Sequence, residues 1–329
     1  MKLVMIGHGM VGHKFIEAIL EKADDKLEIT ILAEEPRIAY DRVHLTEYFS
    51  GKSAKDLSLA RFDFADAHGI DLRLNTKAIA IDTAAQTVTT SLGDVLHYDK
   101  LVLATGSYAF VPPIAGNDRE NCFVYRTIED LDAIRAASLN AKSGVVIGGG
   151  LLGLEAAKAL RDLNLETHVV EFAPRLMAVQ IDDLGGKVLR RKIENLGVKV
   201  HTQKATSSIE AGNDATHVMK FADGSELETD IILFSAGIRP RDELARSSGL
   251  ALGERGGIKI NDYCQTSDEH IYAIGECALW DNKIYGLVAP GYDMARIAAK
   301  HILAEETHCF AGADMSTKLK LMGVDVASV

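Results

Sequence analysis

Cysteine is scarce in this chain. Only four of the 329 residues are cysteines, and no two of them form a C-x-x-C pair. So few cysteines in so long a chain cannot build a disulfide framework, and a reduced, cytoplasmic setting is expected. Apolar runs of about 18 residues are also lacking, so no membrane span is expected. The chain passes from Met1 and Lys2 directly into a short apolar run with glycines, which leaves no room for a signal peptide.

Positive charge is in deficit as well. The 36 lysines and arginines are outnumbered by 47 aspartates and glutamates, which gives a formal net charge of −11. A nucleic-acid-binding protein presents a basic face, so this class is not expected. Short internal repeats and low-complexity segments are missing too, and their absence excludes solenoid arrays. The length indicates two or three globular domains.

One pattern stands out near the start, in the stretch VMIGHGMVGHKF at residues 4–15. The stretch KLVMIG at residues 2–7, with its continuous apolar run, predicts a buried parallel strand. Residues 10–22 have the apolar periodicity of a helix. A second strand follows and ends at Pro36. The glycines have the G-x-G-x-x-G spacing that lets a strand–turn–helix unit hold a pyrophosphate. The helix N-terminus then offers free N–H groups to the phosphates.

The same design occurs a second time. A strand at 144–147 leads into Gly148, Gly150 and Gly153, and a helix and another strand follow. Each copy ends its second strand with acids, Glu34 and Glu35 in the first and Glu171 in the second. A carboxylate there accepts hydrogen bonds from a ribose and repels a 2′-phosphate. Two such sites predict FAD together with a nicotinamide nucleotide, and Glu171 favours NADH. NADPH stays an alternative, because the nearby Arg175 could face its 2′-phosphate.

Four further motifs occur in a fixed order: LVLATGS at 101–107, IGGGLLGLEAA at 147–157, SAGIRP at 235–240 and IYAIGECA at 271–278. They resemble those of two-dinucleotide flavoprotein reductases in the pyridine-nucleotide–disulfide oxidoreductase superfamily. The segments EEPRIAYDRVHLTEYF, CFVYRTIEDL, EFAPRLMA, GLVAPGYDMA and MSTKLKLMGVDVAS are similar to the N-terminal flavoprotein region of the large subunit of NADH-dependent nitrite reductase.

The resemblance implies an α/β fold with two Rossmann-like dinucleotide-binding domains, one inserted in the other. The FAD-binding domain would comprise residues 1–113 and 241–310, and the NADH-binding domain residues 114–240. Residues 311–329 would begin a truncated C-terminal region, because the chain stops at GVDVASV as if a strand were cut. We therefore expect a fragment.

The resemblance also implies cofactor contacts at matching positions. The glycines of the first motif would hold the FAD pyrophosphate, Glu35 the adenosine ribose, and Pro290 would lie near the isoalloxazine ring. The superfamily usually has Asp at the position of Glu276. Two interpretations of Glu155 stay open: a contact with the flavin or nicotinamide region, or a favourable charge near the helix N-terminus. The implied FAD contacts are Gly7, Gly9, Met10, Val11, Gly12, Glu34, Glu35, Arg42, Ala104, Thr105, Gly106, Gly275, Glu276 and Pro290. The implied NADH contacts are Gly148, Gly150, Leu151, Leu152, Gly153, Glu155, Glu171 and Gly237.

Residues 40–52 limit the reactions that the chain could catalyse, because disulfide reductases of this superfamily carry a reactive cysteine in this stretch. Here the stretch has none, and the first cysteine is Cys122. Disulfide reductases and cysteine peroxidases are thereby excluded. No metal site is expected, because Cys264, His270 and Cys277 fit no standard ligand spacing. Hydride transfer from NADH to the flavin remains, and it needs no catalytic side chain.

The resemblance implies where the electrons go next. They would pass singly to an iron–sulfur cluster and a sirohaem in downstream modules absent from this chain, where nitrite becomes ammonia. A small subunit is a further possible partner. A free-standing NADH:rubredoxin or ferredoxin reductase is the alternative enzyme. A flavoprotein that uses NADH only as a conformational signal is the non-enzymatic hypothesis.

Overall fold

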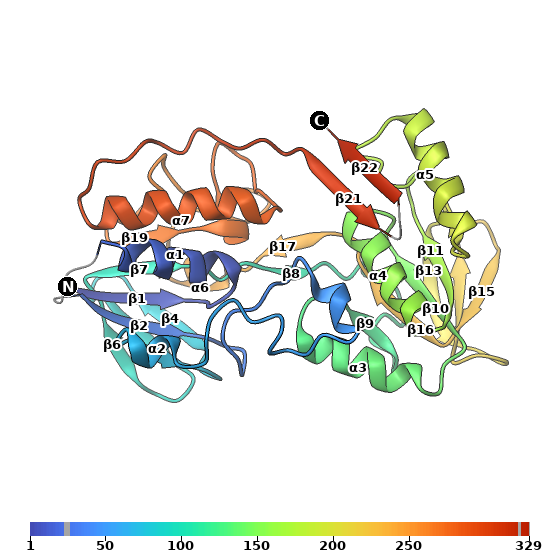
Figure 1. Ribbon diagram of the computed structural model, residues 1–329, viewed down its shortest axis with the longest axis horizontal. Coiled ribbons are helices and arrows are strands. Elements are labelled where there is room, and N and C mark those ends of the chain that lie inside the picture. The colour runs from blue at the N-terminus through green and yellow to red at the C-terminus, as the bar shows by residue number, and fades with distance from the viewer. Residues whose placement is uncertain (23–26, 322–323, 329) are drawn as a thin grey trace. The chain divides into compact units, whose positions relative to one another are not determined.

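The computed structural model describes residues 1–22, 27–321 and 324–328. The chain divides into two compact units, both built from separate segments (Figure 1). The first unit comprises Met1–Asp41, Leu57–Tyr108 and Arg239–Met315, and the second comprises Arg42–Asp56, Ala109–Ile238 and Ser316–Val329. Residues 42–56 thus group with the second unit. The domain bounds of the sequence analysis stay a prediction.

The first unit is built on a five-stranded parallel sheet in the order β19-β7-β1-β2-β3. Its central strand, β1 (Lys2–Ile6), has four consecutive buried side chains, the pattern of a strand that is covered on both faces. Helix α1 (Met10–Leu20) follows it and packs against α7 (Val288–Ile302). The remaining strands are β2 (Glu28–Leu32), β3 (Asp71–Arg73), β7 (Lys100–Leu103) and β19 (Ile271–Ala273).

The second unit repeats this plan, with a parallel sheet in the order β12-β11-β10-β16-β9. Here β10 (Ser143–Ile147) takes the central place and α4 (Leu151–Asp162) follows it. The predicted α/β class with two Rossmann-like folds is confirmed. The other strands are β9 (Cys122–Val124), β11 (Glu166–Val170), β12 (Lys199–His201) and β16 (Ile231–Phe234); the other helices are α3 (Ile128–Ser138) and α5 (Asp183–Asn195).

Each unit also carries a three-stranded antiparallel sheet. The first is β4 (Ala78–Asp82), β5 (Thr87–Thr90) and β6 (Val95–His97), and the second is β13 (Thr206–Ala211), β14 (His217–Phe221) and β15 (Glu226–Thr229). Buried side chains alternate along β14, as expected for a strand with one buried face.

The remaining elements are short. They are β8 (Ser107–Ala109), β17 (Ile238–Pro240), β18 (Ile258–Lys259), β20 (Ala278–Leu279), β21 (Thr317–Leu321), β22 (Val324–Ser328), α2 (Phe64–Ala67), α6 (Glu243–Ser247), and the 3-10 helices η1 (Leu45–Tyr48) and η2 (Gly275–Cys277). Within the described ranges, no helix is both long enough and apolar enough to span a membrane.

Candidate functional site: two glycine cradles

The first cradle, defined as Gly7, Gly9 and Gly12, lies between β1 and α1. Gly7 has φ +101°, and a Cβ there would overlap the carbonyl oxygen of Ala104, the residue that follows β7. A Cβ on Gly12 would lie 2.5 Å from the Gly7 oxygen. A Cβ on Gly9 would meet no atom within 4 Å. Packing within the chain therefore demands glycine at the first and third positions, whereas the second faces open space.

The second cradle, defined as Gly148, Gly150 and Gly153, has the same geometry. Gly148 has φ +122°, and a Cβ there would overlap the carbonyl oxygen of Ser235, the residue that follows β16. A Cβ on Gly153 would overlap the Gly148 oxygen, whereas one on Gly150 would meet nothing within 4 Å. Both cradles thus leave room at the glycine that lets a backbone approach a pyrophosphate.

The helices behind the cradles begin without a polar cap. Gly9 is the N-cap of α1 and Gly150 the N-cap of α4; neither helix has a side-chain cap among the described residues or an acid in its first turn. By contrast, Thr127 caps α3 and Asp182 caps α5 through side-chain oxygens. Neither helix N-terminus is thus covered by a capping side chain of the described residues, and a helix N-terminus of this kind binds anions.

The acids beside the first cradle have different partners. Arg241 Nη1 donates to Glu34 Oε2 at 2.7 Å, and Lys77 Nζ lies 3.3 Å from Glu34 Oε1. Burial alone would raise the pKa of Glu34, but these two cations outweigh it and lower the pKa. Glu35 accepts a 2.8 Å hydrogen bond from the Tyr40 hydroxyl. Both carboxylates follow β2, at the edge of the sheet that carries the glycines.

Glu171, which follows β11, is held by the backbone. One carboxylate oxygen accepts from the Gly149 N–H at 2.5 Å, and the other accepts from the Ala173 N–H at 2.6 Å. The carboxylate is thereby fixed against the second cradle. Arg175 Nη1 donates to Asp183 at 2.7 Å, and its Nε donates to the Ile181 carbonyl at 2.9 Å. The Arg175 guanidinium is therefore committed to its own loop.

Several implied FAD contacts are brought together in the first unit. Val11, on α1, packs close to Gly275: a Cβ added at Gly275 would lie 3.3 Å from the Val11 side chain. Ser107 Oγ donates to Glu276 Oε2 at 2.6 Å, so the longer acid at this position has a partner of its own. Thr105 Oγ1 donates to the Arg241 carbonyl at 2.7 Å, and the Gly106 carbonyl accepts from the Arg241 N–H at 2.9 Å.

Of three other implied FAD contacts, Pro290 and Met10 belong to the first unit and Arg42 to the second. Pro290 is buried in the first turn of α7, where its missing N–H costs no helical hydrogen bond. Met10 begins α1 and lines a small cavity of about 120 Å³ with His13, on the same helix. Arg42 belongs to the second unit, where its Nη1 donates to the Arg126 carbonyl at 3.1 Å. The role of Arg42 beside FAD stays a prediction.

The implied NADH contacts on α4 and near it differ in exposure. Leu151 and Leu152 open the helix, and Leu152 is 47% exposed. Burial raises the pKa of Glu155 to about 7, against the opposing charge of His44. Gly237 has φ +106°, and its carbonyl accepts from the Phe110 N–H at 2.8 Å. Glu155 is thus a partly buried acid whose pKa lies well above that of an exposed glutamate.

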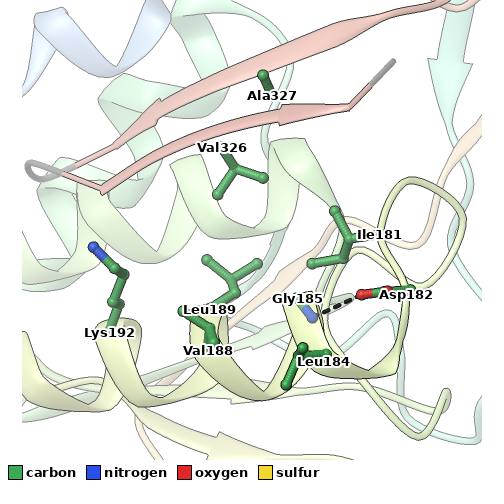
Figure 2. Close-up of a pocket in the computed structure, with 9 residues that line it drawn as sticks. All are labelled: Ile181, Asp182, Leu184, Gly185, Val188, Leu189, Lys192, Val326 and Ala327. Carbon is green, nitrogen blue, oxygen red and sulfur yellow. Dashed lines mark hydrogen bonds between the residues drawn. The ribbon is translucent and has the colours of Figure 1, made fainter.

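A separate cavity of about 470 Å³ lies in the second unit, between α5 and β22 (Figure 2). Apolar side chains, among them Leu184, Val188 and Val326, line much of it. No residue of the second cradle lines this cavity. No cluster of three metal-ligating side chains occurs in the part of the chain that the structure describes.

Comparison with known proteins identifies the family. A family model described as "Pyridine nucleotide-disulphide oxidoreductase" matches residues 1–301. The chain belongs to this family. It is 58% identical over 330 aligned residues to the "Nitrite reductase (NADH) large subunit" of Escherichia coli (strain K12), which covers 100% of this chain and 39% of that relative.

Two further family comparisons cover more of the partner's length. The chain is 31% identical over 312 residues to the "Rubredoxin-NAD(+) reductase" of Alcanivorax borkumensis, covering 94% of this chain and 81% of that relative. Among solved structures, a NAD-dependent persulfide reductase from A. fulgidus gives a TM-score of 0.92 at 29% identity, covering 98% of this chain and 62% of that one.

Family membership implies FAD and a nicotinamide nucleotide, and the cradles fit them. Each cradle combines an uncapped helix N-terminus with open space at its second glycine, the features that a pyrophosphate requires. The assignment of individual residues to each nucleotide stays a prediction. Sequence reasoning missed Arg241 and Ser107, because their carboxylate partners lie 207 and 169 residues away along the chain.

Proposed function

We propose that this chain is an NADH-oxidising flavoprotein module, with FAD in the first cradle and NADH in the second. The observation that carries the proposal is the open space at Gly9 and Gly150, in two cradles whose other glycines are fixed by packing. The 58% identity to a nitrite reductase large subunit supports nitrite as the final acceptor. Because the chain spans only 39% of that relative, nitrite reduction belongs to the proposal.

The residues of the second cradle support NADH over NADPH. Two backbone N–H groups hold the Glu171 carboxylate in place. In this position the carboxylate can accept a hydrogen bond from a ribose hydroxyl and would repel a 2′-phosphate. Arg175, the cation closest in sequence, is bonded to Asp183 and to carbonyls of its own loop.

The chemistry needs little from side chains. When both nucleotides are bound, NADH supplies a hydride and FAD accepts it. The cradles bind and orient the two pyrophosphates through backbone N–H groups. Residues 40–52 contain no cysteine, so this segment offers no thiol as the next electron carrier. We therefore propose that electrons leave for iron–sulfur and sirohaem modules of a longer chain. A small subunit and a cytoplasmic location are part of the same proposal.

Steady-state turnover tests the proposal. The chain, reconstituted with FAD, should oxidise NADH when an artificial dye is the acceptor and should not reduce nitrite. Nitrite turnover by this chain alone would contradict the proposal that nitrite is reduced in other modules. Failure to reduce any dye would contradict the reductase assignment.

A rubredoxin-type reductase is the second candidate. It is favoured by the Alcanivorax relative, because this chain covers 81% of that protein. Reduction of added rubredoxin at a rate that matches the best dye would favour this candidate over the nitrite reductase module.

A further inference from the structure

Arg241 is fastened at two places to the segment that follows β7. Its backbone N–H donates to the Gly106 carbonyl at 2.9 Å, and its carbonyl accepts from Thr105 Oγ1 at 2.7 Å. Its side chain then extends to Glu34, where Nη1 donates to Oε2 at 2.7 Å. Glu34 follows β2, so one residue ties the end of β7 to the end of β2.

The strand order places the first cradle between those two ends. In the first unit's sheet β7 and β2 flank β1 on opposite sides, and all three strands run parallel. The carboxyl ends of parallel strands meet at one edge, with neighbouring strands about 4.8 Å apart. The bridge from Thr105 and Gly106 to Glu34 therefore passes the end of β1, where Gly7 begins the glycine turn.

The guanidinium retains unused donors. Among the described residues, only Glu34 accepts a hydrogen bond from the Arg241 side chain, through Nη1. Nε and Nη2 remain for a ligand, and the side chain is 42% exposed. A planar guanidinium binds phosphate oxygens in pairs, with geometry that an ammonium cannot match. Glu34 holds the guanidinium in place without using up its donors.

We infer that Arg241 is a further cofactor-binding residue: its guanidinium, positioned by Glu34, donates hydrogen bonds to the pyrophosphate of the dinucleotide in the first cradle. The inference rests on the proposed function, since it requires FAD to bind there. Sequence patterns single out Gly7, Gly9 and Gly12 for this task, and the structure adds a cation from a segment more than 200 residues away.

Binding of FAD to the apoprotein tests this inference. The dissociation constant is measured by quenching of flavin fluorescence for wild type, Arg241→Gln, Arg241→Lys and the control Arg246→Gln. Arg246 is also an exposed arginine of the first unit, paired with Asp242 at 3.3 Å. Arg241→Gln should raise the dissociation constant about 10- to 100-fold, as expected for lost hydrogen bonds to a charged group. Arg241→Lys should lie between Arg241→Gln and wild type, and Arg246→Gln should match wild type.

The outcomes separate the inference from the proposal beneath it. If wild type binds no FAD, the proposed function fails. If wild type binds FAD and Arg241→Gln binds it within twofold, or Arg246→Gln weakens binding equally, the inference is wrong. Melting temperatures of the apoproteins provide the structural readout, and they should barely differ because an exposed ion pair contributes little. Should Arg241→Gln unfold, Arg241→Lys decides, and wild-type affinity in that variant would overturn the inference.

Discussion

Alanine substitution at two neighbouring glycines separates the packing role of the first cradle from its binding role. Gly9 has φ −89°, which any residue adopts, and a methyl group there would meet nothing within 4 Å. Gly9→Ala should therefore leave the apoprotein as stable as wild type, or about 0.4–1 kcal/mol more stable through a less flexible unfolded chain. A methyl group at this point would occupy the space left for the pyrophosphate, so FAD affinity should fall.

Gly7→Ala provides the contrast. Alanine at φ +101° costs about 1–2 kcal/mol in backbone strain. Overlap with the Ala104 carbonyl adds roughly 1–3 kcal/mol, the usual cost of overpacking. The expected loss is about 2–5 kcal/mol of unfolding free energy, a large part of a typical domain's stability.

Urea unfolding of the two apoproteins and FAD fluorescence titration give the required numbers. Gly9→Ala should keep the wild-type urea midpoint and raise the FAD dissociation constant about 10- to 100-fold, the scale of lost charged hydrogen bonds. Gly7→Ala should lower the midpoint directly. Wild-type FAD affinity in Gly9→Ala would refute the assignment of the first cradle to a pyrophosphate, and would leave the motif as a packing turn.

Three further predictions concern titration and nucleotide choice. Burial and the neighbouring His13 lower the pKa of His8 from 6.5 to about 4. As pH falls, His8 therefore becomes protonated in the unfolded chain before it does so in the folded protein. Stability should fall as pH drops below 6.5, by about 2 kcal/mol between pH 7 and 5, and His8→Phe should remove this part in urea titrations. Burial raises the pKa of Glu155 from 4.5 to about 7. The loss of folding stability that this carboxyl causes therefore grows as pH rises from 4.5 to 7. Glu155→Gln should be up to about 3 kcal/mol more stable than wild type at pH 8 and nearly equal at pH 4; equal midpoints at pH 8 would contradict this. Glu171→Gln should shift the NADPH-to-NADH ratio of kcat/KM about tenfold toward NADPH, about 1.4 kcal/mol, and an unchanged ratio would argue against its role in selection.

Local patterns predicted the parts of the fold that depend on neighbouring residues. Continuous apolar runs gave β1 and β10, and the helices after them begin at Met10 and Leu151, directly behind the glycine turns. The repeated spacing also predicted two folds of the same kind. These features depend on the periodicity of apolar residues and on the steric requirements of a tight turn. Both can be recognised from a few consecutive residues.

Pairings between distant residues could not be predicted in this way. The sequence marks Glu34 as an acid at a strand end, but its cation, Arg241, is brought near only by the sheet order and by the return of the chain to the first unit. The partial burial of Glu155, which raises its pKa, likewise depends on packing around α4 rather than on its motif. The grouping of residues 42–56 with the second unit has no local signal either.

Anaerobic mixing of the FAD-loaded chain with NADH tests the central claim most directly. Loss of the oxidised flavin absorbance reports hydride transfer without any acceptor module. We expect rapid bleaching by NADH and clearly slower bleaching by NADPH. Absent or very slow bleaching by NADH, in protein that retains FAD, would contradict the reductase function, and equal rates with both nucleotides would contradict the selection by Glu171.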